Sequence, residues 1–229
     1  MANILVVAAH PDDEVLGCGG TIARHVQQGD RVKVVILAEG ITSREGTVEA
    51  SAALQKLRAA AQAANAQLGV HALALEGLPD NRLDSLDRLE IIQRIEAHVK
   101  EWQPHTVYTH HVGDVNIDHQ VAHHAVVTAC RPQPGHPVKT LLFFETPSST
   151  EWQPPGSGAA FQPNWFVNIQ DTLPNKIEAL KAYASEMREW PHPRSYQAVE
   201  HLARWRGACV GVEAAEAFVV GRVVNPSRI

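Results

Sequence analysis

Apolar runs of strand length alternate along this chain with longer segments of helix-forming residues. Residues 4–9 are continuously apolar, which is typical of a strand buried on both faces of a sheet, and residues 32–37 predict a second such strand. Between them, residues 21–26 predict a helix that stops at Gly29 and Asp30. A strand, a helix and a strand in this order form a βαβ unit, whose two strands lie parallel and are joined by a right-handed crossover.

The same alternation continues through most of the chain. We expect helices at residues 48–68, 86–102, 118–129 and 173–190, and strands at 71–75, 106–110, 141–145, 165–169 and 217–223. This order predicts an α/β fold with a Rossmann-like, mostly parallel sheet flanked by helices. No linker-like segment divides the sequence, so we expect a single domain over residues 1–229, with a core at 1–147 and a C-terminal extension at 148–229 that completes the site.

Composition and charge narrow the function classes. The chain is 45% apolar and 20% charged, as in ordinary globular proteins, and it carries a formal net charge of -5. With no arginine-rich run, this charge argues against a nucleic-acid partner. No apolar run approaches the ~20 residues of a membrane span. The three cysteines form no paired motif, so we expect a cytoplasmic protein without a membrane span; a homo-oligomer is compatible with this composition.

Polar clusters follow four of the predicted strands, at the points where these strands end. The clusters lie at residues 10–14, 39–45, 80–81 and 110–119. In an open α/β sheet, ligands bind beyond the carboxyl ends of the strands. Because core packing does not require four polar clusters on one rim, the pattern predicts a functional site there.

Histidine and aspartate in the first and last of these clusters suit a catalytic zinc site. Such a zinc ion takes three protein ligands of the His and Asp/Glu type and leaves one position to water. His10 and Asp13 lie across a tight turn and can point at one ion, and the fourth strand offers several histidines as a third ligand. Asp12 lies beside them and is free to act as the base. The alternative is a turn in which an aspartate caps the next helix.

Several motifs resemble those of the LmbE/PIG-L family of zinc-dependent N-deacetylases. They are residues 9–14 (AHPDDE), 17–21 (GCGGT), 78–84 (LPDNRLD), 116–119 (NIDH), 192–195 (HPRS) and the segment 206–218. The first motif is highly specific, and the matches span nearly the whole chain. The resemblance implies hydrolysis of an N-acetyl group on an amino-sugar conjugate, such as a nucleotide-linked or lipid-linked hexosamine.

The resemblance also implies roles for particular residues. Zn²⁺ would be held by His10, Asp13 and His119. Asp12 would be the general base that later gives its proton to the leaving amine. Asp118 would orient a ligand or a neighbouring polar group.

One position departs from the family pattern. Several members have a histidine three residues before the last zinc ligand, where it is thought to steady the oxyanion, whereas this chain has Asn116. An Asn amide can donate a hydrogen bond but carries no charge. We expect Asn116 to act as a neutral oxyanion donor together with the zinc, with His110 or His111 as alternatives.

Further residues are expected to contact the small acetylated sugar substrate: Arg44, Arg58, Asp80, His192 and Arg194. Each also has an ordinary explanation as a solvated or loop residue. Two other functions stay open, an amide deacylase acting on a non-sugar metabolite and a non-catalytic sugar- or nucleotide-binding module of Rossmann-like fold. The glycines at 17, 19 and 20 do not match Gly-x-Gly-x-x-Gly directly after the strand.

Overall fold

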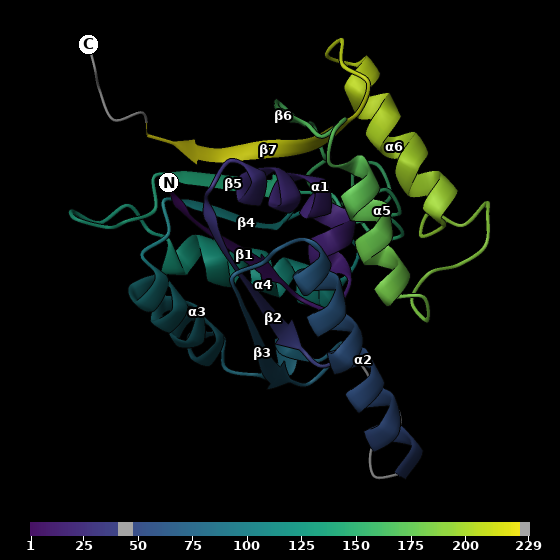
Figure 1. Ribbon diagram of the computed structural model, residues 1–229. Helices are drawn as coiled ribbons and strands as arrows, with labels where there is room; N and C mark the ends of the chain where they lie inside the picture. Colours follow the sequence, from purple (N-terminus) through teal and green to yellow (C-terminus); the bar gives the residue numbers. More distant parts are fainter. Residues whose placement is uncertain (41–47, 225–229) are drawn as a thin grey trace, which may run out of the picture.

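The computed structural model describes residues 1–40 and 48–224, and its strands form a seven-stranded sheet in the order β3-β2-β1-β4-β5-β7-β6 (Figure 1). The strands are Asn3–Ala8 (β1), Arg31–Ala38 (β2), Ala72–Leu78 (β3), Thr106–His110 (β4), Thr140–Phe144 (β5), Trp165–Asn168 (β6) and Ala215–Val223 (β7). β1 to β5 pair in parallel, whereas β7 pairs antiparallel with both β5 and β6. The predicted α/β fold with a mostly parallel sheet is confirmed.

Helices cover both faces of this sheet. They are Asp13–Gln27 (α1), Val48–Gln67 (α2), Arg88–Trp102 (α3), Ile117–Ala129 (α4), Leu173–Ala182 (α5) and Tyr196–Ala208 (α6), with a 3-10 turn at Leu83–Ser85 (η1). Alternate residues of β1 face opposite sides, so Val6 joins a core with α1, α2 and α5 while Val7 joins one with α3 and α4 (Figure 1). None of the described helices is both long enough and apolar enough to cross a membrane.

The helix boundaries differ from the prediction in two places. Helix α1 begins at Asp13, well before the predicted residue 21, because the glycine-rich stretch is helical and only Cys18 departs from helical backbone angles. Gly17 is required there, since a Cβ at this position would lie 2.3 Å from Cδ2 of Phe144. The helix predicted at 173–190 ends at Ala182, and α6 follows as a helix that the sequence pattern did not predict.

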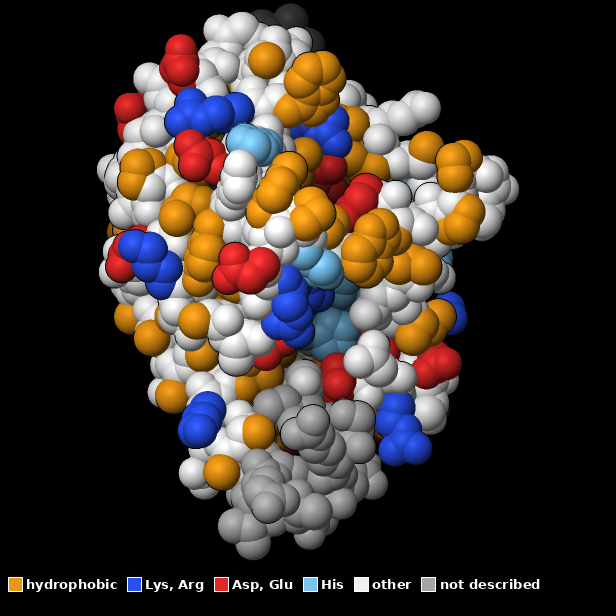
Figure 2. All heavy atoms as spheres, turned by 90° about the vertical axis from the view of Figure 1, so that its right-hand side faces the viewer, with side chains coloured by type: hydrophobic (Ala, Val, Ile, Leu, Met, Phe, Trp, Pro, Cys, Tyr) orange, Lys and Arg blue, Asp and Glu red, His pale blue; other side chains and the backbone are white. Residues whose placement is uncertain are grey.

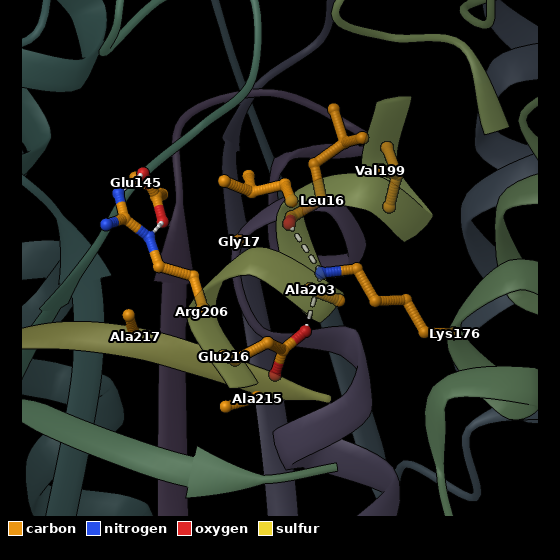
Figure 3. Close-up of a pocket in the computed structure, with 11 residues that line it drawn as sticks. Leu16, Gly17, Glu145, Lys176, Val199, Ala203, Arg206, Ala215, Glu216 and Ala217 are labelled. Atoms are coloured by element: carbon orange, nitrogen blue, oxygen red, sulfur yellow. Dashed lines mark hydrogen bonds and ion pairs between the residues drawn. The ribbon is translucent and has the colours of Figure 1, made fainter. Parts of the chain in front are cut away.

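A buried ion pair ties the C-terminal strand to the break in α1. Nζ of Lys176 lies 2.6 Å from Oε1 of Glu216 and 2.8 Å from the carbonyl oxygen of Leu16 (Figure 3). The carboxylate of Glu216 also accepts hydrogen bonds from the backbone N–H groups of Gly20 and Thr21. These N–H groups begin the second half of α1, where the kink leaves them without helical acceptors, so Glu216 caps this half.

We predict that Lys176→Met lowers the free energy of unfolding by ~3–5 kcal/mol, because the substitution leaves the carboxylate of Glu216 buried without its cation. Lys181→Met on the same helix is the matched control, since Lys181 pairs with Glu178 at the exposed surface and should change stability little. Chemical denaturation of both variants measures the difference. Equal free energies of unfolding for the two variants would show that the buried ion pair stabilises the protein no more than an exposed one.

Candidate metal centre and active site

The carboxyl ends of β1 and β4 bring the predicted metal ligands together. His10 and Asp13 follow β1, and His119 lies in the first turn of α4, just after β4. Nδ1 of His10 and Nε2 of His119 lie 3.3 and 3.2 Å from Oδ2 of Asp13. Figure 2 views this side of the molecule and shows histidine side chains inside a hollow, with a Lys or Arg side chain beside them.

Two atoms of this cluster fit the requirement for a metal ion. Among the described residues, buried Oδ1 of Asp13 has no hydrogen-bond partner, and buried Nε2 of His119 makes no well-aligned hydrogen bond although it lies 3.2 Å from Oδ2 of Asp13. Buried polar atoms are almost always paired, so each unpaired one needs an explanation. One ligand atom each from His10, Asp13 and His119 lies within 4.8 Å of the others, and the set of two imidazoles and one carboxylate suits Zn²⁺.

Both histidines present their second ring nitrogen to a carboxylate. Nε2 of His10 lies 3.0 Å from Oδ2 of Asp118, and Nδ1 of His119 lies 3.0 Å from Oδ2 of Asp114. Carboxylates in this position fix the tautomer and the ring orientation of metal-bound histidines. Both imidazoles are therefore oriented with one nitrogen directed at Asp13.

The electrostatics of the cluster favour a positive charge. Burial lowers the pKa of His10, but its hydrogen bonds to Asp118 and Asp13 outweigh burial and raise this pKa to about 10. Burial likewise opposes the raised pKa of His119, which the charge of Asp13 and the hydrogen bond to Asp114 bring to about 9. The same carboxylates that raise these pKa values would also favour a divalent cation bound between them.

His110 lies close to the same cluster but is engaged elsewhere. Its Nε2 accepts a hydrogen bond from the backbone N–H of Ala9, and its Nδ1 lies 3.3 Å from Oγ1 of Thr146. Burial is the largest cause of a pKa for His110 far below its usual range. With both ring nitrogens in use, this neutral imidazole supports the packing of the site.

Asp12 has a backbone conformation that is rare for residues other than glycine, with φ at 107°. Its N–H donates to Oε2 of Glu14, and its Oδ2 accepts from Nη1 of Arg194 at 2.9 Å. The carboxylate of Glu14 is fixed in turn by Asn65 and Tyr183. Burial raises the pKa of Asp12 well above its usual range, and the charge of Arg194 opposes this shift. A raised carboxyl pKa suits a general base that must also return its proton.

Asn116 caps helix α4. Its Oδ1 accepts from the N–H groups of Asp118 and His119, and its Nδ2 lies 3.4 Å from Oδ1 of Asn81. The side-chain NH₂ group is therefore the part of Asn116 that can meet an oxyanion. His111, the other alternative, points its Nε2 at the carbonyl oxygen of Ala159.

The five expected substrate contacts fall into different places. Oδ1 of Asp80 lies 3.3 Å from Nε2 of His10, at the metal cluster. Arg194 contacts Asp12, and His192 accepts a hydrogen bond from the backbone N–H of Arg194. Arg58 forms an ion pair with Glu39 at the end of β2. The fifth, Arg44, lies outside the described residues.

Two residues at the site had no predicted role. Asp114 receives hydrogen bonds from Ser149 and Thr150 and holds His119, and Glu14 holds the backbone of Asp12. Both are completely buried. Glu14 lies in the first motif and Asp114 in the polar cluster at residues 110–119, but the partners that fix these carboxylates are distant in the sequence.

Comparison with known proteins supports the family resemblance. The family described as "PIG-L: GlcNAc-PI de-N-acetylase" matches residues 5–130. The chain belongs to the PIG-L family. The uncharacterized deacetylase YaiS of Escherichia coli (strain K12) is 30% identical over 189 residues, which cover 80% of this chain and 91% of that protein.

Two further matches cover nearly the whole chain. The 1D-myo-inositol 2-acetamido-2-deoxy-alpha-D-glucopyranoside deacetylase of Rhodococcus erythropolis is 27% identical, covering 98% of this PIG-L chain and 87% of the relative. The 4-carboxy-2-hydroxymuconate hydratase GalB of Pseudomonas putida KT2440 has a TM-score of 0.81 at 22% identity, with both chains fully covered. This last match shows a shared fold, so the reaction has to be argued from the site residues.

We predict that Asp114→Asn weakens zinc affinity by ~10–100-fold, because the amide no longer holds His119 as a carboxylate does. Competition with a chromogenic chelator measures this affinity. Asp171→Asn is the control, since Asp171 is an exposed acidic residue. Unchanged affinity in Asp114→Asn would show that Asp114 does not orient a metal ligand.

Two substitutions separate the capping role of Asn116 from a role in catalysis. Asn116→Ala removes both the cap and the amide donor, and should cost ~1 kcal/mol of stability. Asn116→Ser keeps an oxygen that can cap α4 but lacks the NH₂ group. If this group meets the oxyanion, kcat falls by ~10²–10³ in both variants. Full turnover of the Ser variant would limit Asn116 to capping.

Proposed function

We propose that this protein is a zinc-dependent N-deacetylase that acts on an N-acetylated amino-sugar conjugate, a nucleotide-linked or lipid-linked hexosamine. The observation that supports it most is a pair of buried atoms beside His10, Oδ1 of Asp13 and Nε2 of His119, for which the described part of the chain supplies no well-aligned hydrogen bond. Asp12 lies directly next to this set in the chain. Three metal ligands and an adjacent carboxylate form the combination that metal-assisted amide hydrolysis requires.

In this proposal, His10, Asp13 and His119 hold the zinc ion, and Asp118 and Asp114 fix the two imidazoles. The bound ion supplies Lewis acidity toward the acetamide carbonyl and lowers the pKa of a water molecule. Asp12 takes the proton from the attacking water and later delivers it to the leaving nitrogen. The NH₂ group of Asn116 is the neutral donor to the oxyanion.

The substrate class follows from the relatives and from the polar groups around the cluster. The Rhodococcus relative is named for a substrate in which an acetamido sugar is joined to inositol. Asp80, 3.3 Å from His10, is suited to accept hydrogen bonds from sugar hydroxyls. We assign Arg44, Arg58, His192 and Arg194 to the surroundings of the same substrate.

The base assignment is tested with Asp12→Asn. Asn tolerates the positive φ of this position and is nearly isosteric, so the variant should fold and bind stoichiometric zinc. It should lose most acetate release, because an amide cannot accept the proton of water. Acetate release and metal content are measured on one preparation, across N-acetylated nucleotide sugars, lipid-linked sugars and free sugars.

The results of this experiment also decide between the alternatives. Acetate release from non-sugar amides alone would favour the deacylase acting on another metabolite. A protein that purifies without zinc and binds sugars, with binding unchanged in Asp12→Asn, would favour the non-catalytic module. Full hydrolytic activity of Asp12→Asn would reject Asp12 as the base.

A further inference from the structure

The guanidinium of Arg194 is held in a fixed position beside Asp12. Its Nη1 donates to Oδ2 of Asp12 at 2.9 Å, and its Nε donates to Oγ of Ser148 at 2.7 Å. The backbone is fixed as well, because the N–H of Arg194 donates to Nδ1 of His192 and its carbonyl accepts from the N–H of Arg188. The side chain is 24% exposed, so the charge lies at the border between the site and the solvent.

These contacts leave part of the guanidinium unused. Arginine has five N–H donors in a planar fork, and Nη2 of Arg194 makes no hydrogen bond within the described part of the chain. Of the two imidazoles expected as alternative donors, His110 has both ring nitrogens in hydrogen bonds. His111 directs Nε2 at the carbonyl of Ala159, and its Nδ1 is buried without a partner among the described residues, so it offers no positive charge fixed beside Asp12. Arg194 is therefore a cation next to the proposed general base, Asp12, and it has free N–H donors that can bind a second anion.

We propose that Arg194 is a catalytic residue whose guanidinium donates hydrogen bonds to the oxyanion formed from the acetamide carbonyl. The inference rests on the proposed deacetylase function. It adds a charged donor to the neutral amide of Asn116, whose Oδ1 is committed to capping α4. Charged donors are roughly twice as strong as neutral ones, so this one would dominate the stabilisation that side chains provide.

In the proposed step, one negative charge moves from the carboxylate of Asp12 to the carbonyl oxygen of the acetamide. The water oxygen forms a bond to the carbonyl carbon, one water proton goes to the carboxylate of Asp12, and the carbonyl π electrons go to the oxygen. Asp12 becomes neutral as the oxyanion becomes negative, so the anionic partner of Arg194 changes from carboxylate to oxyanion. When the oxyanion collapses, the C–N bond breaks and the proton on Asp12 passes to the nitrogen. The products are a free amine and acetic acid, which ionises to acetate.

The geometry allows this change of partner without a large movement. A general base lies ~2.6–3.2 Å from the atom that it deprotonates. The attacking oxygen and the oxyanion are bonded to the same tetrahedral carbon. Since Nη1 of Arg194 is 2.9 Å from Oδ2 of Asp12, a small rotation of the guanidinium brings a donor to the oxyanion.

The test compares Arg194→Ala with Arg188→Ala. The second variant removes an exposed arginine of the same segment, whose side chain donates to the nearby carbonyl groups of Ser185 and Met187. In the zinc-loaded enzyme, Arg194→Ala should lower kcat by ~10²–10³ and change KM little. Zinc content should match the wild type. The melting temperature of Arg194→Ala should fall, because Asp12 loses a buried ion pair, so kcat is compared at a temperature at which both variants are fully folded. Added guanidinium chloride at millimolar concentration should restore part of the turnover of Arg194→Ala and of neither the wild type nor the control.

A binding measurement provides a second readout that does not depend on turnover. The probe is a phosphonate analogue of the substrate, whose tetrahedral anion mimics the oxyanion state. Its Kd should rise by ~10²–10³ in Arg194→Ala, while the Kd of the product amine stays the same. Arg194→Lys keeps a charge but not the planar fork, and should fall between the wild type and the Ala variant.

Several results would overturn the inference. A raised KM with unchanged kcat would limit Arg194 to holding the substrate. If kcat falls in proportion to zinc content, or if the affinity for the phosphonate is unchanged, Arg194 has only a structural role. If the wild type is active and Arg194→Ala equally so, this inference alone fails. If the wild type neither releases acetate from any conjugate nor binds the phosphonate, the proposed function fails with it.

Discussion

The site depends on negative charge that is buried around two histidines. Asp13, Asp114 and Asp118 are all fully buried next to His10 and His119, and one oxygen of Asp13 has no hydrogen-bond partner in the part of the chain that the structure describes. Buried charges are tolerated only when they are paired or coordinate a metal. The surrounding hydrogen bonds fix each carboxylate in place, and the raised pKa values of His10 and His119 show that the cluster favours positive charge. The metal ion proposed above would meet the same requirement, and it would explain why these side chains are arranged as they are.

The local sequence was sufficient to predict the sheet and the edge of the sheet at which this cluster lies. Buried strands at the start of the chain and a polar motif at their carboxyl ends identify a sheet and its rim, because both signals come from neighbouring residues. The pair His10 and Asp13 could be predicted in the same way, since a tight turn joins them. The proposal of His119 over His110 required the family motif. The hydrogen bonds support this proposal, because both ring nitrogens of His110 are already in use.

The remaining features depend on contacts between distant residues. Arg194 reaches Asp12 across 182 positions, and no periodicity or spacing encodes such a contact. Helix α6 was missed because its apolar face is narrow, with Val199, Ala203 and Gly207 as its buried residues. The capping role of Asn116 was readable in principle, since Asn before a helix is a preferred N-cap.

The contact of Glu216 with α1 also bears on how the protein is made. This carboxylate accepts hydrogen bonds from the N–H groups of Gly20 and Thr21, and Gly20 lies 196 positions before Glu216. During synthesis these donors therefore leave the ribosome long before their acceptor. Helix α1 gains this cap only after β7 has been made, and Asp12 gains the guanidinium of Arg194 only after the chain has reached the start of α6. An early segment of the fold is thus among the last to reach its final contacts.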